Sequence, residues 1–123
     1  MNVGIDFDNT ITANPKFFKE LVNDLLSSGR NLIYIISSCA KEDEPTLSEI
    51  RTRKSLQLNE WGIPFERLEL ALEPIPENKA FLCESHGIGL MIDDDLRNLE
   101  AIMKRDPSIV CVQFFPPNGD EGR

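Results

Sequence analysis

The run from Val3 to Thr10 places two carboxylates, two residues apart, at the end of an apolar stretch. Its apolar head, Val3 to Ile5, is typical of a buried strand, and acids at the tip of such a strand are costly to bury unless a cation or hydrogen bonds compensate them. Side chains two residues apart on a strand point to the same face, so Asp6 and Asp8 can converge. The run therefore predicts a polar site, with a cation, where a strand ends.

Two further apolar runs end in polar residues, which argues against an isolated pair of solvated turn acids. Residues 31–36 precede two serines at 37–38, and residues 89–92 precede three acids at 93–95. In an open parallel sheet, ligands bind outside the carboxyl ends of the strands, so groups that are distant in sequence can meet there. Lys79, near the predicted start of a helix, can add an ammonium that reaches a phosphate.

Strand-like and helical segments alternate along the chain. Apolar spacing and capping residues predict strands and helices over the following segments, in chain order: strand 3–5, helix 15–28, strand 31–36, helix 46–60, strand 67–71, a helix after Lys79, strand 89–92, helix 96–105 and strand 109–114. This alternation predicts an α/β fold, a three-layer α/β/α Rossmann-like sandwich with a mainly parallel sheet of about five strands.

Length and composition fit one small domain. We expect a catalytic domain over residues 1–115 and a flexible tail over residues 116–123. The formal net charge of −8 argues against general nucleic-acid binding. Three widely spaced cysteines, with no signal segment and no membrane-length apolar run, predict a cytoplasmic protein that does not enter a membrane. The basic cluster from Arg51 to Lys54 is interpreted as a solvated helix face rather than an anion site.

The polar motifs together resemble the haloacid dehalogenase-like (HAD) superfamily of phosphoryl-transfer enzymes. Residues 6–10, Asp-Phe-Asp-Asn-Thr, match its first motif, and Ser37 at the end of an apolar strand matches its second. Lys79 matches the third motif, and the pair Asp93-Asp94 matches the fourth. The motifs follow the family's order, and the resemblance covers nearly the whole chain.

The resemblance implies a magnesium-dependent phosphomonoester hydrolase without a large cap domain. Asp6 would be the nucleophile that forms an aspartyl-phosphate, and Asp8 the general acid and base. The implied Mg²⁺ ligands are Asp6, Asp8 through its backbone carbonyl, Asp93 and Asp94. The implied phosphate-binding residues are Asn9, Thr10, Ser37, Ser38 and Lys79. A capless site admits a small phosphorylated molecule or an exposed phosphate on a larger one, and residues 39–45 could form a small lid.

Several alternatives stay open at this point. Ser37 is preferred over Ser38 because it directly follows the apolar run, and Asp95 is interpreted as a helix-capping acid. A phospho-receiver domain is disfavoured because the predicted strand 67–71 does not carry its acceptor aspartate. A non-catalytic phosphate- and magnesium-binding module that works with a partner, and a nucleotide or polynucleotide-end phosphatase, are the remaining alternatives.

Overall fold

The protein, a computed structural model described over residues 1–39 and 46–117, is built on a parallel five-stranded sheet. The strand order is β3-β2-β1-β4-β5. The strands are β1 (Asn2–Ile5), β2 (Leu32–Ser38), β3 (Arg67–Ala71), β4 (Ile88–Asp93) and β5 (Val110–Gln113). The predicted fold class is therefore confirmed, and the sheet is parallel at each of its four pairings.

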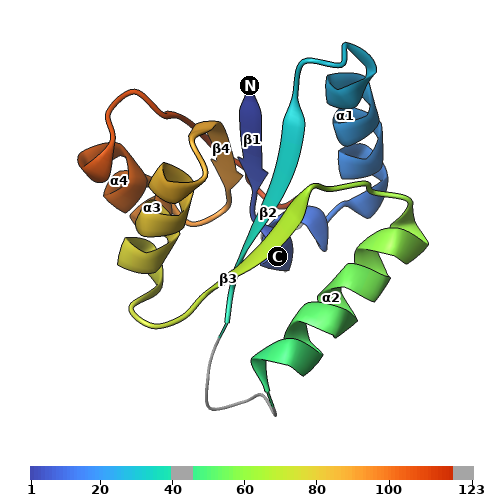
Figure 1. The fold of residues 1–123 in the computed structure, drawn as a ribbon, viewed down its shortest axis with the longest axis horizontal. Helices are drawn as coiled ribbons and strands as arrows, with labels where there is room; N and C mark the ends of the chain where they lie inside the picture. The colour runs from blue at the N-terminus through green and yellow to red at the C-terminus, as the bar shows by residue number, and fades with distance from the viewer. Residues whose placement is uncertain (40–45, 118–123) are drawn as a thin grey trace.

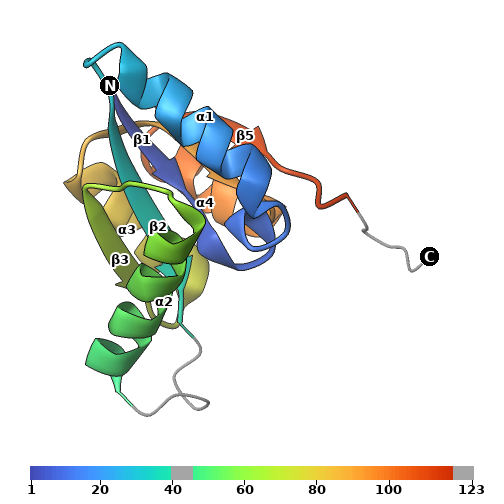
Figure 2. The same ribbon diagram turned by 90° about the vertical axis from the view of Figure 1, so that its right-hand side faces the viewer.

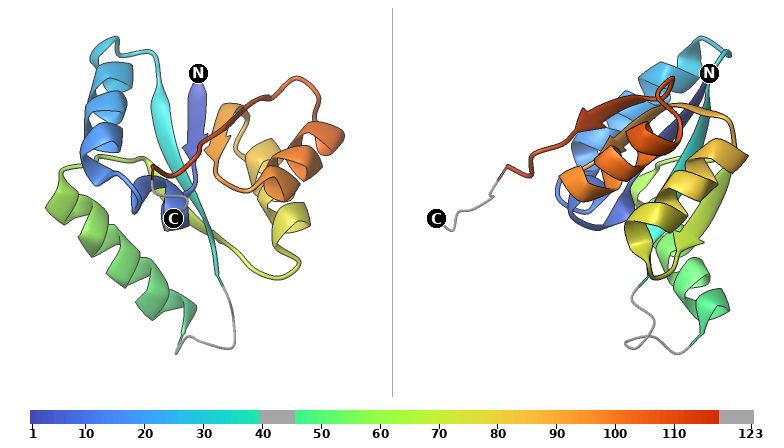
Figure 3. Two further views of the ribbon diagram at one scale, coloured as in Figure 1. Left: turned by 180° about the vertical axis from the view of Figure 1, so that it is seen from behind. Right: turned by 90° about the vertical axis from the view of Figure 1, so that its left-hand side faces the viewer.

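Helices cover both faces of this sheet. Figure 1 shows α1 (Pro15–Ser27) and α2 (Leu47–Trp61) on one side, and α3 (Ile75–Ser85) and α4 (Leu96–Arg105) on the other. The same three layers are seen from behind in Figure 3. No helix in the described ranges has the length and apolar character that crossing a membrane requires.

The alternation of β2 divides its side chains between two apolar cores. Ile33 and Ile35 belong to the core beneath α1 and α2, whereas Tyr34 and Ile36 belong to the core beneath α3 and α4. This is the period-two pattern of a strand that is buried on both faces. Because both faces are covered, the polar residues at the carboxyl ends of the strands are left at one edge of the sandwich.

Local capping fixes where the helices begin. The side chains of Asn14, Thr46 and Asp95 each accept a hydrogen bond from a backbone N–H in the first turn of the following helix, as N-caps do. The capping prediction for Asp95 is confirmed. The predicted helix start after Lys79 is wrong, because α3 begins at Ile75 and tolerates Pro76 in a first turn that needs no intrahelical N–H donor.

The chain order of the strands creates a switch point beside β1. The chain moves outward from β1 through β2 to β3, which lie side by side in Figure 2, and then returns to the other side of β1 for β4 and β5. In open α/β sheets, ligands bind where the strand order reverses in this way. The ends of β1 and β4 therefore mark the expected binding position.

Two predicted segments fall largely outside the described residues. The described residues do not include positions 40–45 of the predicted lid or positions 118–123 of the predicted tail. The proposed domain boundary at residue 115 stays a prediction.

The packing of α1 on the sheet gives a test of the fold. Phe18 is fully buried, with its ring 5.1 Å from that of Phe114, whereas the neighbouring Phe17 is 46% exposed. We expect Phe18→Ala to lower the free energy of unfolding by about 3–5 kcal/mol, because it leaves a cavity in the core. Phe17→Ala is the matched control, and urea unfolding measures both. Equal losses in the two variants would contradict the packing described.

Candidate functional site

Three carboxylates converge at the switch point. Asp6 directly follows β1, Asp93 is the last residue of β4, and Asp94 comes next. One oxygen atom of each lies within 4.8 Å of the others. Asp6 and Asp93 are buried, whereas Asp94 is partly exposed. The cluster therefore has a buried floor and one side that faces solvent.

The ammonium of Lys79 lies beneath this cluster. Its Nζ atom donates to Asp6 Oδ1 at 2.6 Å and to Asp93 Oδ2 at 2.7 Å, and its side chain is fully buried. Thr10 Oγ1 donates to the other oxygen of Asp6 at 2.9 Å. Asn98 Nδ2 donates to Asp93 Oδ2 at 3.3 Å. Each carboxylate oxygen has two lone pairs, so these contacts orient the acids without using all of their acceptor capacity.

The charges in this cluster do not balance. Three carboxylates and one ammonium leave two formal negative charges in a largely buried place. Burial raises the pKa of Asp6 to about 8, although Lys79 opposes the shift. Burial lowers the pKa of Lys79, but the adjacent Asp6 and Asp93 carboxylates outweigh it, so the pKa is raised and the lysine stays charged. The excess negative charge calls for a proton or a cation.

A second buried lysine lies at the same edge of the sheet, and the sequence interpretation missed it. Lys54 was assigned to a solvated face of its helix, but it is only 4% exposed. Its Nζ atom donates to Ser37 Oγ at 2.6 Å, and to Asp8 Oδ2 and Ser38 O at 3.1 Å each. The solvated-face interpretation is therefore wrong for Lys54.

The spacing of α2 held the signal that could have found Lys54. It lies four residues after Ile50 and four before Leu58, and both of these side chains are buried. Residues four apart lie on the same face of a helix, so the inward face includes position 54. The apolar residues Leu47 and Leu56 of the same helix are 45% and 58% exposed.

The other predicted site residues lie along the same edge. Thr10 and Ser37 are buried, and each contacts a charged side chain of the site. Asn9 has a positive φ of 63°, and its backbone N–H donates to Thr12. The side chain of Asp8 is half-exposed and lies outside the three-carboxylate cluster, since it pairs with Lys54. The structure thus gathers Asp6, Asp93 and Asp94 in one group, and Asp8 and Ser37 in another.

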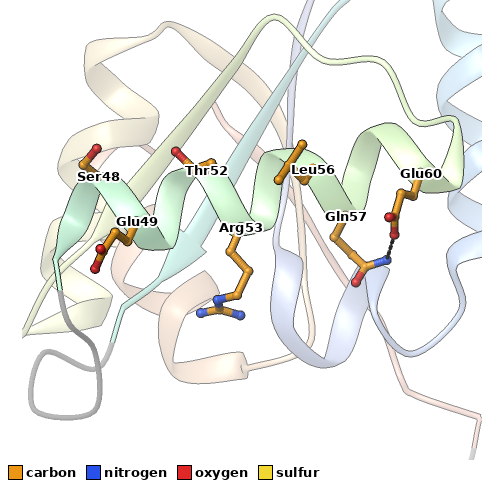
Figure 4. A pocket seen from close by; sticks show the side chains of 7 residues that line it. All are labelled: Ser48, Glu49, Thr52, Arg53, Leu56, Gln57 and Glu60. Atoms are coloured by element: carbon orange, nitrogen blue, oxygen red, sulfur yellow. Dashed lines mark hydrogen bonds between the residues drawn. The ribbon is translucent and has the colours of Figure 1, made fainter.

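A surface hollow elsewhere on the molecule is distinct from this site. Figure 4 shows it on the outer face of α2, where Gln57 and Glu60 share a hydrogen bond. Its lining residues are spaced along one helical face, opposite to Lys54: Ser48, Glu49, Thr52, Arg53, Leu56, Gln57 and Glu60. The hollow contains none of the predicted site residues.

Comparison with known proteins finds likeness only in the fold. No protein-family model and no curated protein matches the chain. A solved universal stress protein in complex with cAMP is 7% identical, with a TM-score of 0.56, and the match covers 92% of this chain and 96% of that one. A protein of the universal stress protein family from Burkholderia pseudomallei is 12% identical, with a TM-score of 0.55 and coverage of 94% and 95%.

These matches overturn the resemblance to the HAD superfamily. The predicted membership is wrong, because two solved structures that match nearly the whole chain are universal stress proteins. The predicted hydrolase, with an aspartyl-phosphate on Asp6 and Asp8 as acid and base, and its phosphatase alternatives are wrong with it. Acids and hydroxyls that follow parallel strands are common to the ligand-binding edge of open α/β sheets, so such motifs indicate an architecture more than a family.

The raised pKa of Asp6 gives a test of the buried cluster. The folded protein holds a proton on Asp6 up to about pH 8, whereas an unperturbed aspartate releases it near 3.8. The folded state therefore binds more protons, and metal-free stability from this group falls as pH rises through that window. We expect urea unfolding in EDTA to show this loss in the wild type and a flatter profile in Asp6→Asn. Identical profiles in the two proteins would contradict the assignment.

Proposed function

We propose that the chain binds a small phosphate-containing ligand, specifically a nucleotide, together with Mg²⁺ at the carboxyl edge of its sheet. The convergence of Asp6, Asp93 and Asp94 at the switch point between β1 and β4 carries this proposal. Open α/β sheets bind their ligands at that position, and the cluster has excess negative charge there. A cation that neutralises this charge makes the site able to accept an anion.

The donor atoms of the cluster fit Mg²⁺. They are carboxylate oxygens, which are the hard ligands that this ion prefers, and among the described residues the cluster includes neither histidine nor cysteine. Asp6, Asp93 and Asp94 would hold the ion, with the backbone carbonyl of Asp8 as a further predicted ligand. Mg²⁺ usually keeps several waters and binds phosphate oxygens beside one or two carboxylates, and it would supply that link to the ligand here.

Two observations support a nucleotide as the ligand. Hydroxyl groups that can donate to phosphate, those of Thr10 and Ser37, lie beside the charged groups of the edge. A universal stress protein that shares this fold was solved with cAMP.

The described cysteines 39, 83 and 111 are free thiols, which fits the proposed cytoplasmic location.

Metal binding is tested with Mn²⁺, which has the same ligand preference and can be counted by electron paramagnetic resonance. We expect Asp93→Asn to weaken Mn²⁺ binding about tenfold or more, because it removes a charged ligand. Asp95→Asn is the matched control, since Asp95 caps α4 and asparagine is an equally good cap. Similar affinities in both variants would place the metal elsewhere, and wild-type protein that binds no Mn²⁺ would refute the metal site.

Nucleotide binding is tested by calorimetry with cAMP, AMP and ATP, each with and without Mg²⁺. We expect binding that strengthens when Mg²⁺ is present, because the ion offsets the repulsion between carboxylates and phosphate. Asp93→Asn should remove most of that Mg²⁺ effect, and Asp95→Asn should keep it. Chromatography of the recovered nucleotide shows that the affinity refers to intact ligand. Failure of all three nucleotides to bind would refute the proposed ligand class.

A further inference from the structure

The two buried lysines of the site have different surroundings. Lys79 is fully enclosed, and it donates hydrogen bonds to the two buried carboxylates Asp6 and Asp93. Lys54 is paired with Asp8, whose side chain is 53% exposed. An ammonium enclosed by buried acids stabilises the floor of the site. An ammonium whose partner faces solvent can change partners without opening the core.

The contacts of Lys54 define a position for an anion. Its three N–H groups point to one hydroxyl, one backbone carbonyl and one carboxylate oxygen, at Ser37, Ser38 and Asp8 respectively. The hydroxyl and the carbonyl hold the ammonium in place, and Nζ also lies 5.1 Å from the centre of the Phe7 ring. The carboxylate of Asp8 is the only one of the three hydrogen-bonded groups that carries charge and belongs to an exposed side chain.

We propose that Lys54 is the cation that contacts the ligand's phosphate, and that the Asp8 carboxylate holds this position until the phosphate replaces it. This inference rests on the proposed function and deepens it. It adds a phosphate-binding residue from α2, and it makes the Asp8 carboxylate a competitor of the phosphate for the Lys54 ammonium. A phosphate oxygen and a carboxylate oxygen make the same charge-assisted hydrogen bond to an ammonium. Ser37, which is already bonded to Lys54, lies where its hydroxyl can also contact the incoming group.

If phosphate replaces the Asp8 carboxylate on Lys54, substitutions of Lys54 and of Asp8 should change phosphate affinity in opposite directions. Calorimetry with inorganic phosphate, with and without Mg²⁺, is the measurement. Lys54→Met should weaken phosphate binding about tenfold or more, because a charge-assisted hydrogen bond is lost. Asp8→Asn should strengthen phosphate binding several-fold, because a neutral amide competes less well for the ammonium. Lys104→Met, on the exposed face of α4, and Asp24→Asn, on the exposed face of α1, are the matched charge controls.

The double variant separates exchange from simple repulsion. If phosphate replaces Asp8 on Lys54, Asp8→Asn gives no gain in a Lys54→Met background, because there is no ammonium to release. If Asp8 only repels phosphate through space, the gain persists in that background, and the proposal is overturned. Unchanged phosphate affinity in Lys54→Met, or wild-type protein that binds no phosphate under either condition, overturns it as well.

Mn²⁺ affinity and circular dichroism show whether Lys54→Met changes phosphate binding alone or also disturbs the metal site or the fold. Among the described residues, Lys54 donates to Ser37, Ser38 and Asp8 rather than to the three clustered carboxylates, so Mn²⁺ affinity should stay within about twofold in Lys54→Met. Wild-type protein that binds phosphate but no Mn²⁺ would refute the metal site alone, since the metal-free titration still reports on Lys54. Circular dichroism checks that Lys54→Met is folded. If it is not, Lys54→Gln takes its place in both the single and the double variant, because its neutral side-chain amide can still donate a hydrogen bond in the site.

Discussion

The ammonium of Lys79, buried between Asp6 and Asp93, holds the carboxyl edge of the sheet together. It joins α3 to the ends of β1 and β4, the two strands on either side of the switch point. Two carboxylates this close and this buried would repel each other strongly in a medium of low dielectric constant. With one ammonium between them they still carry one formal negative charge, and the third acid, Asp94, adds a second. The need for a cation arises from this arrangement.

Lys54 and Asp8 form a second group of charges at the same edge of the sheet. Lys54 comes from α2, on the opposite face of the sheet from α3, and pairs with the more exposed Asp8. The site thus takes one lysine from each helical layer. The two lysines differ in what surrounds them, which explains why one suits a structural role and the other suits an exchangeable one. Ser37, at the end of β2, is the group that connects Lys54 to the sheet.

The motifs indicated the edge of the sheet correctly but indicated the wrong family. From sequence alone, Asp6, Ser37 and Asp93 were placed at strand ends and Lys79 near the start of a helix. The structure brings all four to one edge. The conclusion that these residues form a HAD phosphatase was wrong, because two solved structures that match nearly the whole chain are universal stress proteins. Short polar motifs after buried strands follow from the physics of parallel sheets, and many proteins of this architecture share that physics.

The sequence by itself determined the alternating elements, their capping residues and the polar groups that end three of the strands, because periodicity and capping are local properties. Only the tertiary structure decided which of these groups meet. Lys54 belongs to a helix whose apolar pattern is weak, and although its spacing from Ile50 and Leu58 places it on the inward face, only the packing of the chain brings it to Ser37 and Asp8. The separation of Asp8 from the other acids was likewise decided by packing, since it depends on an ammonium supplied from 46 residues away.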